Sequence, residues 1–373
     1  MRQGYILAVL QHQHDVNKLA LFQLRASRRR RRKGQRRRIW IRAWISRRRQ
    51  YAIYDRLLLE LRNEDHTSFT NFMRMPPEMF DELLARVGPR ITKQHTWYRA
   101  PIEPGLKLAL TLCHLASGSR YASMKFGWRV PHNTQSLIVR EVCQAIIDEY
   151  LEEVISCPTT PDGWRAISDK FRTKWNFLHT LGAIDGRHIA WRCPANSWSM
   201  YYNYKGFYSI VLMALVDADY KFIWADVGDT QIYNHCELKE GAENDTIGFP
   251  DPDPMPNGTQ DVSYFWIGDD AFALRHYMMK PYGQRSLTKE ERIFNYRLSR
   301  ARRVENVFSI LSNRFQVLLS TMQHHPLDQN LEDTQTVSGP PNTASMDGKT
   351  QRELIKHWVN SPGGAVPLQH RMI

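Results

Sequence analysis

The hydrophobic pattern of the chain changes its period once, and this change most constrains the fold. Over 51–160 apolar side chains recur every three or four positions, as they do in 79–87 and 106–115. From Trp175 onward they fall into short runs of branched and aromatic residues separated by turn residues. A period of three to four indicates amphipathic helices, and short bounded runs indicate strands. We therefore expect an all-helical domain over 51–160 and an α/β domain over 175–322.

Helices and breaks alternate in the second half of the helical domain. A helix ends at a Gly-containing break at 116–118, a short helix follows, and a second break at 129–132 precedes a long helix. This order is compatible with a helix-turn-helix DNA reader, whose last helix enters the groove. Such a reader would bring three residues near DNA: Asn133, Gln135 and Arg140. The same order equally suits a plain helical bundle beside another domain.

The α/β domain is expected to begin with three consecutive antiparallel strands. Together with one short buried strand further on, they cover 179–190, 207–216, 221–227 and 264–268. The polar, Pro-rich and acidic stretch 237–261 is predicted to be a long loop. A long helix is predicted over 292–321, because its apolar residues recur at helical spacing. The remaining 323–373 is predicted to be a polar tail with a short helical pattern near 353–359.

Positive charge is concentrated in one segment. The net charge is +13, yet fourteen Arg and Lys fall between Arg25 and Arg49 with no acid among them, so the rest is nearly neutral. We interpret 1–50 as a disordered basic arm. Clustered Arg neutralise phosphates and release counterions, so the arm predicts a nucleic-acid contact, a nuclear import signal or both. A solvated leader without a specific partner is the alternative. The nucleic-acid-binding residues expected here are Arg28, Arg29, Arg30, Arg31, Arg32, Lys33, Arg36, Arg37 and Arg38.

Two further classes of protein are disfavoured by composition. The longest apolar stretches, 106–116 and 209–216, are far shorter than the roughly 20 residues that cross a bilayer, so we expect no transmembrane span. The first residues lack a small-residue cleavage site, and we expect no secretory signal. Five cysteines are scattered without any pair at metal-ligand spacing, which favours reduced packing residues in an intracellular protein.

Three acids occupy positions that suggest chemistry. Asp185 interrupts an apolar strand, Asp269 ends another, and Glu305 borders the apolar stripe of the predicted helix. A buried carboxylate without a counter-charge is costly, and a divalent metal supplies that charge. Three such side chains can hold two metal ions about 4 Å apart, which stabilise the attacking and leaving oxygens of phosphoryl transfer. Oxygen ligands favour Mg²⁺ or Mn²⁺ over zinc.

The acids and their neighbours also have structural interpretations. Acids at strand ends are frequent in turns, as Asp217 and Asp219 illustrate. Asp270 competes with Asp269, because neighbours on a strand point to opposite faces and only one can join a site. His188 could bind a metal, but a lone His beside a strand is more often a hydrogen-bonded structural residue.

Six ordered blocks of sequence resemble the PIF/Harbinger transposase-derived nucleases. They read GAIDGRHI at 182–189, YNYKGFYS at 202–209, ALVDA at 214–218, IGDDAF at 267–272, KPY at 280–282 and ENVF at 305–308. The resemblance extends back through 72–75 and the helical domain to the end of the arm, and forward to about residue 319. Several blocks in one order are more specific than any single motif.

The resemblance implies an RNase H-like mixed sheet with flanking helices and a DDE triad of Asp185, Asp269 and Glu305. It selects Asp269 over Asp270, because the family carries its second acid directly after this Gly. It implies that Mg²⁺ or Mn²⁺ activates water to cut a DNA strand, and that in active transposases the freed 3′ hydroxyl attacks target DNA. It also implies a Myb-like companion protein that supplies DNA specificity or nuclear import, and a location in the nucleus.

Basic residues and departures from the family pattern surround Glu305. Arg300, Arg302 and Arg303 are predicted either to contact phosphates or to lie on a solvated helix face. One residue between Arg303 and Glu305 is missing relative to the family spacing. One residue corresponds to about 100° of rotation around a helix, so the missing residue turns either the arginines or Glu305 and its following stripe to a different face of the helix. In addition, the polar 323–343 stands where relatives carry an apolar helix.

Two functions follow from these observations, and a third has less support. The first is a nuclear, metal-dependent DNA endonuclease of transposase origin. The second is a catalytically inert DNA-binding protein of the same descent, which the departures favour. The third hypothesis, an RNA-binding protein, is supported by the basic arm alone. The first two separate at the acids, because only a nuclease loses cleavage when Asp185 is changed to Asn.

Overall fold

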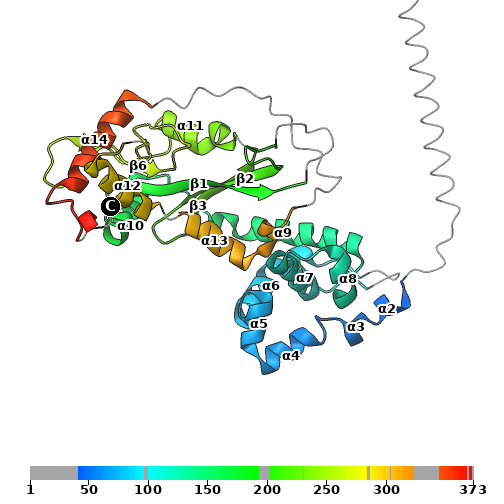
Figure 1. Ribbon diagram of the computed structural model, residues 1–373. Coiled ribbons are helices and arrows are strands. Elements are labelled where there is room, and N and C mark those ends of the chain that lie inside the picture. The colour runs from blue at the N-terminus through cyan, green and yellow to red at the C-terminus, as the bar shows by residue number, and fades with distance from the viewer. Residues whose placement is uncertain are drawn as a thin grey trace, which may run out of the picture.

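A computed structural model describes residues 41–95, 100–192, 201–229, 231–283, 286–302, 304–322, 344–367 and 369–371, apart from the side chains of 304, 305 and 371. Helices form the first part of the chain, and a mixed sheet covered by helices forms the rest (Figure 1). The basic arm lies outside the described residues up to position 40. No helix among the described residues is long and apolar enough to span a membrane.

The helical part follows the periodicity of its sequence. Its helices are α2 Ala43–Ser46, α3 Arg48–Tyr51, α4 Leu57–Glu64, α5 His66–Met73, α6 Pro77–Ile91, α7 Pro104–Ser117, α8 Tyr121–Trp128 and α9 His132–Val154. α5 begins where the Asp65 side chain accepts a hydrogen bond from the Ser68 N–H at 2.9 Å. α7 ends at Gly118, whose φ of 64° favours glycine. Apolar faces of α4 to α9 meet in one core that includes Leu108 and Val142.

Breaks separate α7, α8 and α9 where the sequence predicted them. One expectation at the start of α9 is wrong. Gln135 is fully buried, and its side-chain amide donates to the Val130 carbonyl at 2.8 Å. The residue satisfies a backbone group inside the protein and therefore cannot contact DNA. Asn133 and Arg140 are exposed.

Five strands form the main sheet, in the order β3-β2-β1-β6-β7. They are β1 Thr180–Ala190, β2 Ser209–Val216, β3 Phe222–Gly228, β6 Phe265–Ile267 and β7 Met278–Met279. β1, β2 and β3 are antiparallel neighbours, as predicted, whereas β6 runs parallel to β1 and β7 runs parallel to β6. This mixed sheet with flanking helices confirms the α/β class and is consistent with an RNase H-like fold.

Further helices and a small second sheet complete this part. They are α10 Pro161–Trp175, η1 Ile232–His235, α11 Glu237–Glu243, β4 Asp253–Pro254, β5 Asp261–Val262, α12 Lys289–Ala301, α13 Val304–Arg314, η2 Gln316–Leu319, α14 Met346–Asn360 and η3 Gln369–Arg371. Alternate strand residues enter two separate cores. On what we call the first face, Ala183, Ala214 and Ile267 pack with α12, α13 and α14. On the second face, Ile184 and Trp266 pack with η1 and α11.

The helix predicted over 292–321 is two helices. α12 ends at Ala301 and α13 begins at Val304. Arg302 closes α12, because its N–H bonds to the Leu298 carbonyl while its ψ of 35° leaves the helix. The apolar stripe continues on both sides of this break, so periodicity alone did not reveal it. The break falls where the sequence is one residue short of the family spacing.

Two segments expected to be mostly irregular contain helices, one of which extends the helical pattern predicted near 353–359. The predicted loop 237–261 begins with α11, whose Leu238 and Ala242 are buried at four-residue spacing. The predicted tail 323–373 contains α14, whose Ile355 and Val359 enter the core of the first face. Both helices have short apolar stripes in polar sequences, and packing on the sheet stabilises them more than helix propensity does.

Candidate active site

Two of the three predicted acids stand at the same level of the sheet. Ala183 on β1 pairs in parallel with Ile267 on β6. Two residues further along each chain segment are Asp185 and Asp269. Neighbouring strands lie about 4.8 Å apart and side chains two positions apart on a strand share a face, so the Asp185 carboxyl group extends on the first face, while Asp269 directly follows the end of β6 at the same level. The parallel pairing of β1 with β6 therefore brings together two acids that are distant in sequence.

The helix that carries the third acid packs on the same face. Glu305 belongs to the first turn of α13, and Val307 and Phe308 are buried in the core of the first face. The guanidinium of Arg187, two positions after Asp185 on β1, donates to the Phe308 carbonyl at 3.0 Å. This contact ties the strand to the helix. The Glu305 side chain lies outside the described residues, so the structure places its backbone.

Backbone N–H groups orient both aspartates. Asp185 Oδ1 accepts a hydrogen bond from the Gly186 N–H at 2.8 Å, and Asp269 Oδ1 accepts one from the Ala271 N–H at 2.9 Å. Both residues are half-buried. A carboxylate has about four lone-pair sites, so a bond of this kind fixes the group and leaves it able to bind a cation.

The surroundings of Asp269 distinguish it from Asp270. Gly268, directly before Asp269, packs so tightly that a Cβ there would lie 2.7 Å from Cδ2 of Phe272. A larger residue would therefore displace the end of β6. Asp270 is exposed and forms an ion pair with Lys280 at 3.2 Å, and the same ammonium donates to the Asp270 carbonyl at 3.1 Å. Lys280 thus holds Asp270 in a structural ion pair.

The donors at this site fit a hard divalent cation. Asp185 and Asp269 offer carboxylate oxygens from adjacent positions, and such ligands suit Mg²⁺ or Mn²⁺. Among the described side chains, no group of three His, Cys, Asp or Glu could hold a metal ion. The side chain of Glu305 is not among the described ones. The structure therefore positions two carboxylates and the helix that carries the third predicted acid.

His188 lies on the other face of the sheet. It is three positions from Asp185 on β1, so the two side chains alternate in direction. Its Nδ1 is hydrogen-bonded to Ser209 Oγ at 2.9 Å, and the same hydroxyl accepts from the Asn203 amide at 2.8 Å. Burial, and secondarily the nearby charge of Lys205, lower the pKa of His188. These contacts favour a structural role for this residue.

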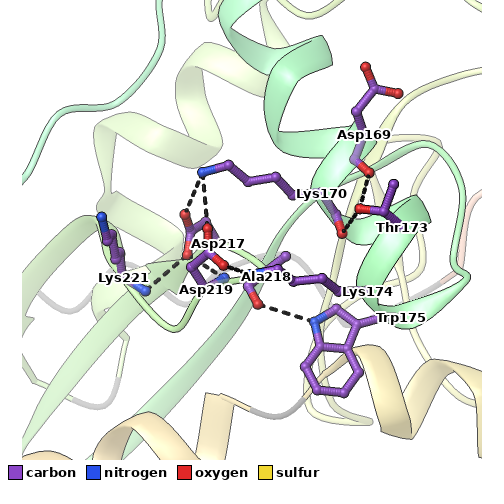
Figure 2. Close-up of polar contacts among 9 residues, drawn as sticks. All are labelled: Asp169, Lys170, Thr173, Lys174, Trp175, Asp217, Ala218, Asp219 and Lys221. Atoms are coloured by element: carbon purple, nitrogen blue, oxygen red, sulfur yellow. Dashed lines mark hydrogen bonds and ion pairs between the residues drawn. The ribbon is translucent and has the colours of Figure 1, made fainter.

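The acids at the β2–β3 turn are held within the protein (Figure 2). Asp217 Oδ1 accepts hydrogen bonds from the N–H groups of Asp219 at 2.8 Å and Lys221 at 2.9 Å, which shapes the turn. Lys170 of α10 pairs with Asp217 at 3.5 Å and with Asp219 at 3.1 Å. Lys174, one turn further on α10, pairs with Asp219. The structural interpretation of strand-end acids is correct for this pair.

The predicted nucleic-acid-binding residues are only partly described. The arm positions 28–33 and 36–38 lie outside the described residues, as does Arg303. Arg300 is half-buried on α12, with its guanidinium 5.8 Å from the centre of the Tyr296 ring. Arg302 is half-buried at the end of α12. Both stand close along the chain to the start of α13.

Sequence reasoning missed two arginines that support the site. Arg187 lies two positions after Asp185 on β1, so the two side chains share a face. This spacing could have indicated from the sequence that Arg187 lies near the site. Arg297 interrupts the apolar stripe of α12 and is buried. It donates to the Gly364 carbonyl at 2.8 Å and also to the Asn176 carbonyl, which ties α12 to the segments after α14 and α10. Burial lowers the pKa of Arg297 to about 10.

Comparison with protein families identifies the segment that holds the acids. Residues 184–337 match the family model of the DDE superfamily endonucleases. The matched segment begins one residue before Asp185 and includes Asp269 and Glu305. The match supports a transposase-like nuclease function, with DNA as the substrate and the divalent metals that these endonucleases generally use. Neither the curated proteins nor the solved structures contain a match to the chain.

Proposed function

We propose that this protein is a metal-dependent DNA endonuclease of the PIF/Harbinger type, in which Asp185, Asp269 and Glu305 hold Mg²⁺ or Mn²⁺. The observation that carries the proposal is the parallel register of β1 and β6, which sets Asp185 and Asp269 at one level of the sheet. The helix α13 packs on the first face and carries the third acid in its first turn. The match of 184–337 to endonucleases supports the reaction class.

The residues of the chain have distinct tasks in this proposal. Bound metal ions would supply charge for the phosphoryl oxygens and lower the pKa of an attacking water. The Gly186 and Ala271 N–H groups orient the two aspartates. Arg187 holds α13 against β1, which keeps Glu305 near the strand ends. Arg300 and Arg302 are proposed to contact phosphates of the bound DNA.

The arm and an external partner are proposed to direct the enzyme. The acid-free run of Arg and Lys at 25–49 supports DNA binding and nuclear import. A Myb-like companion protein is proposed to supply sequence specificity. Replacing the Arg of 28–32 by Gln should abolish nuclear accumulation of a fluorescent fusion of the full chain. Unchanged accumulation would reject the import role of the arm.

Plasmid nicking tests the nuclease directly. The parent should nick supercoiled DNA with Mn²⁺ and stop when the metal is chelated. Asp185→Asn should abolish nicking and keep the metal-free affinity for duplex DNA. Asp226→Asn is the matched control, because Asp226 is an exposed acid of β3 that pairs with Met213 of the second face. Equal nicking by the parent and Asp185→Asn would reject the proposed triad.

An inert DNA-binding protein of the same descent is the second candidate. The break between α12 and α13, at the point where the family spacing lacks a residue, favours it. Thermal unfolding with Mn²⁺ distinguishes the two. A metal at 100 times its dissociation constant stabilises the native state by about 2.7 kcal/mol. A cooperative melt that ignores Mn²⁺ supports the inert binder, and stronger competition by RNA than by duplex DNA supports RNA binding.

A further inference from the structure

Two short helices carry cations and aromatic rings onto the end of α8. α2 and α3 lie close to α8 in the helical part (Figure 1). The guanidinium of Arg48 donates to the Arg129 carbonyl at 3.1 Å, and the Arg129 guanidinium donates to the Trp44 carbonyl. The Ile53 N–H donates to the Gly127 carbonyl at 3.1 Å. These long-range contacts fix the last residues of the basic arm, 43–50, against α8, so this part of the arm is helical and not, as expected, disordered.

The aromatic rings at this junction remain open to solvent. Phe126 is 64% exposed and Tyr51 is 57% exposed. Trp44 stacks on Phe126, with ring centres 6.0 Å apart and planes inclined by 29°. Lys125 lies 4.6 Å from the centre of the Phe126 ring, and Arg129 lies 5.0 Å from the centre of the Tyr51 ring. Each exposed ring therefore has a cation beside it.

The positive charge at this junction is not neutralised by neighbouring acids. The chain has no acid at 41–54 and none at 104–140. Arg47, Arg49 and Lys125 form no ion pair with the residues that the structure describes. Other arginines of the helical part differ in this respect. Arg62 pairs with Asp81, Arg90 pairs with Glu149, and Arg86 pairs with Glu149 and Glu153.

We propose that this basic-aromatic surface binds single-stranded nucleic acid. The surface consists of Arg47, Arg49, Tyr51, Lys125, Phe126 and Arg129. The cations hold phosphates, and the exposed rings of Tyr51 and Phe126 stack against unpaired bases. Stacking requires bases that are free of a duplex, and it tolerates any sequence because every base has a π face. The proposal goes beyond the nuclease, since it uses none of the three acids.

Binding by the full chain without metal tests the surface independently of cleavage. The probes are a fluorescent single-stranded DNA, an RNA of the same sequence and the corresponding DNA duplex, each titrated over a series of salt concentrations. Phe126→Leu should weaken single-strand binding about tenfold at every salt concentration and leave duplex binding unchanged. The double variant Arg47→Gln, Arg49→Gln should reduce the salt slope on single strands by about 1.4, because each phosphate contact contributes about 0.7.

Matched controls separate this surface from the rest of the chain. The double variant Arg62→Gln, Arg90→Gln removes the same charge from ion-paired positions and should leave the salt slope unchanged. Ile147→Ala, at an exposed apolar residue of α9, should leave single-strand affinity unchanged. The proposal would be overturned if Phe126→Leu bound single strands as tightly as the parent does, or if the two double variants gave equal salt slopes. Preference for the DNA or the RNA strand then identifies the sugar that the surface accepts.

Discussion

Two pairs of aspartates lie within or next to strands of one sheet, yet different helices pack near them. Asp217 and Asp219 lie beside α10, which brings two lysines to them. Asp185 and Asp269 lie near α13, whose first turn carries a further acid, Glu305. The first pair is neutralised from within the chain. The second pair lies on the side of the sheet where the helix with the third proposed metal ligand packs.

The difference shows how a structural carboxylate differs from a candidate ligand. Two like charges 4 Å apart repel by about 4 kcal/mol at an effective dielectric constant of 20. A lysine in an adjacent helix removes this cost at the β2–β3 turn. In the proposed metal site, a bound divalent cation would supply the counter-charge for Asp185 and Asp269. The role of an acid in this sheet therefore depends on the helix that packs near it.

The largest expected effect is on catalysis at the second pair. Asp269→Asn should lower Mn²⁺-dependent nicking by about 10³-fold, because it removes a charged metal ligand. Its melting temperature should be unchanged or higher, since one source of repulsion is removed. Asp219→Asn, at the other pair, should keep parental nicking. An Asp269→Asn protein that nicks as fast as the parent would contradict the comparison.

A smaller loss is expected when α13 is released from β1. Arg187→Met removes the donor to the Phe308 carbonyl, so the first turn of α13 can shift relative to Asp185. A displacement of about 1 Å can cost on the order of 100-fold in rate. Two measurements on Arg187→Met test this prediction: the nicking rate, and the Mn²⁺ affinity by calorimetry. Arg187→Lys should recover part of both, because an ammonium can still donate; no recovery would argue against a positioning role.

At the β2–β3 turn the expected effect is on stability. Asp217→Ala leaves two backbone N–H groups and a lysine without their acceptor, and should lower the free energy of unfolding by about 2 kcal/mol. Nicking per folded molecule should not change. Asp169→Asn is the control, because its ion pair with Arg172 is exposed and contributes only about 0.5 kcal/mol. Urea unfolding measures both, and equal losses would refute the structural assignment.

Acidification below about pH 6.5 should weaken the protein through its buried histidines. Burial lowers the pKa of His114, His179 and His188 below the ordinary 6.5. The unfolded chain therefore takes up protons first as the pH falls below about 6.5, and stability declines until the folded pKa values are passed. The melting temperature should fall as the pH is lowered from 7.5 to about 5, and His179→Asn should reduce that fall. A flat profile would contradict these shifts.

Much of the fold was accessible from the sequence. The helices of 51–160, the breaks around α8 and the three antiparallel strands are confirmed, because each depends on a local period or a turn residue. α11 was missed and α14 was predicted only in its second half, near 353–359, since their apolar stripes are short and form helices only against the sheet. The long helix over 292–321 was wrong because both halves have the same period. The arm's partner, the Myb-like companion and the nuclear location stay predictions.

The sequence by itself determined the periods of the two parts, the positions of the acids and the concentration of basic residues before position 50. Only the tertiary structure decided which residues meet. The parallel pairing of β1 with β6 brings Asp269 to the level of Asp185 in the sheet, and packing leaves Phe126 on α8 exposed but buries Gln135 on α9. The physical reason is that periodicity reports which face of an element is apolar, whereas contacts between distant elements depend on how those faces pack together.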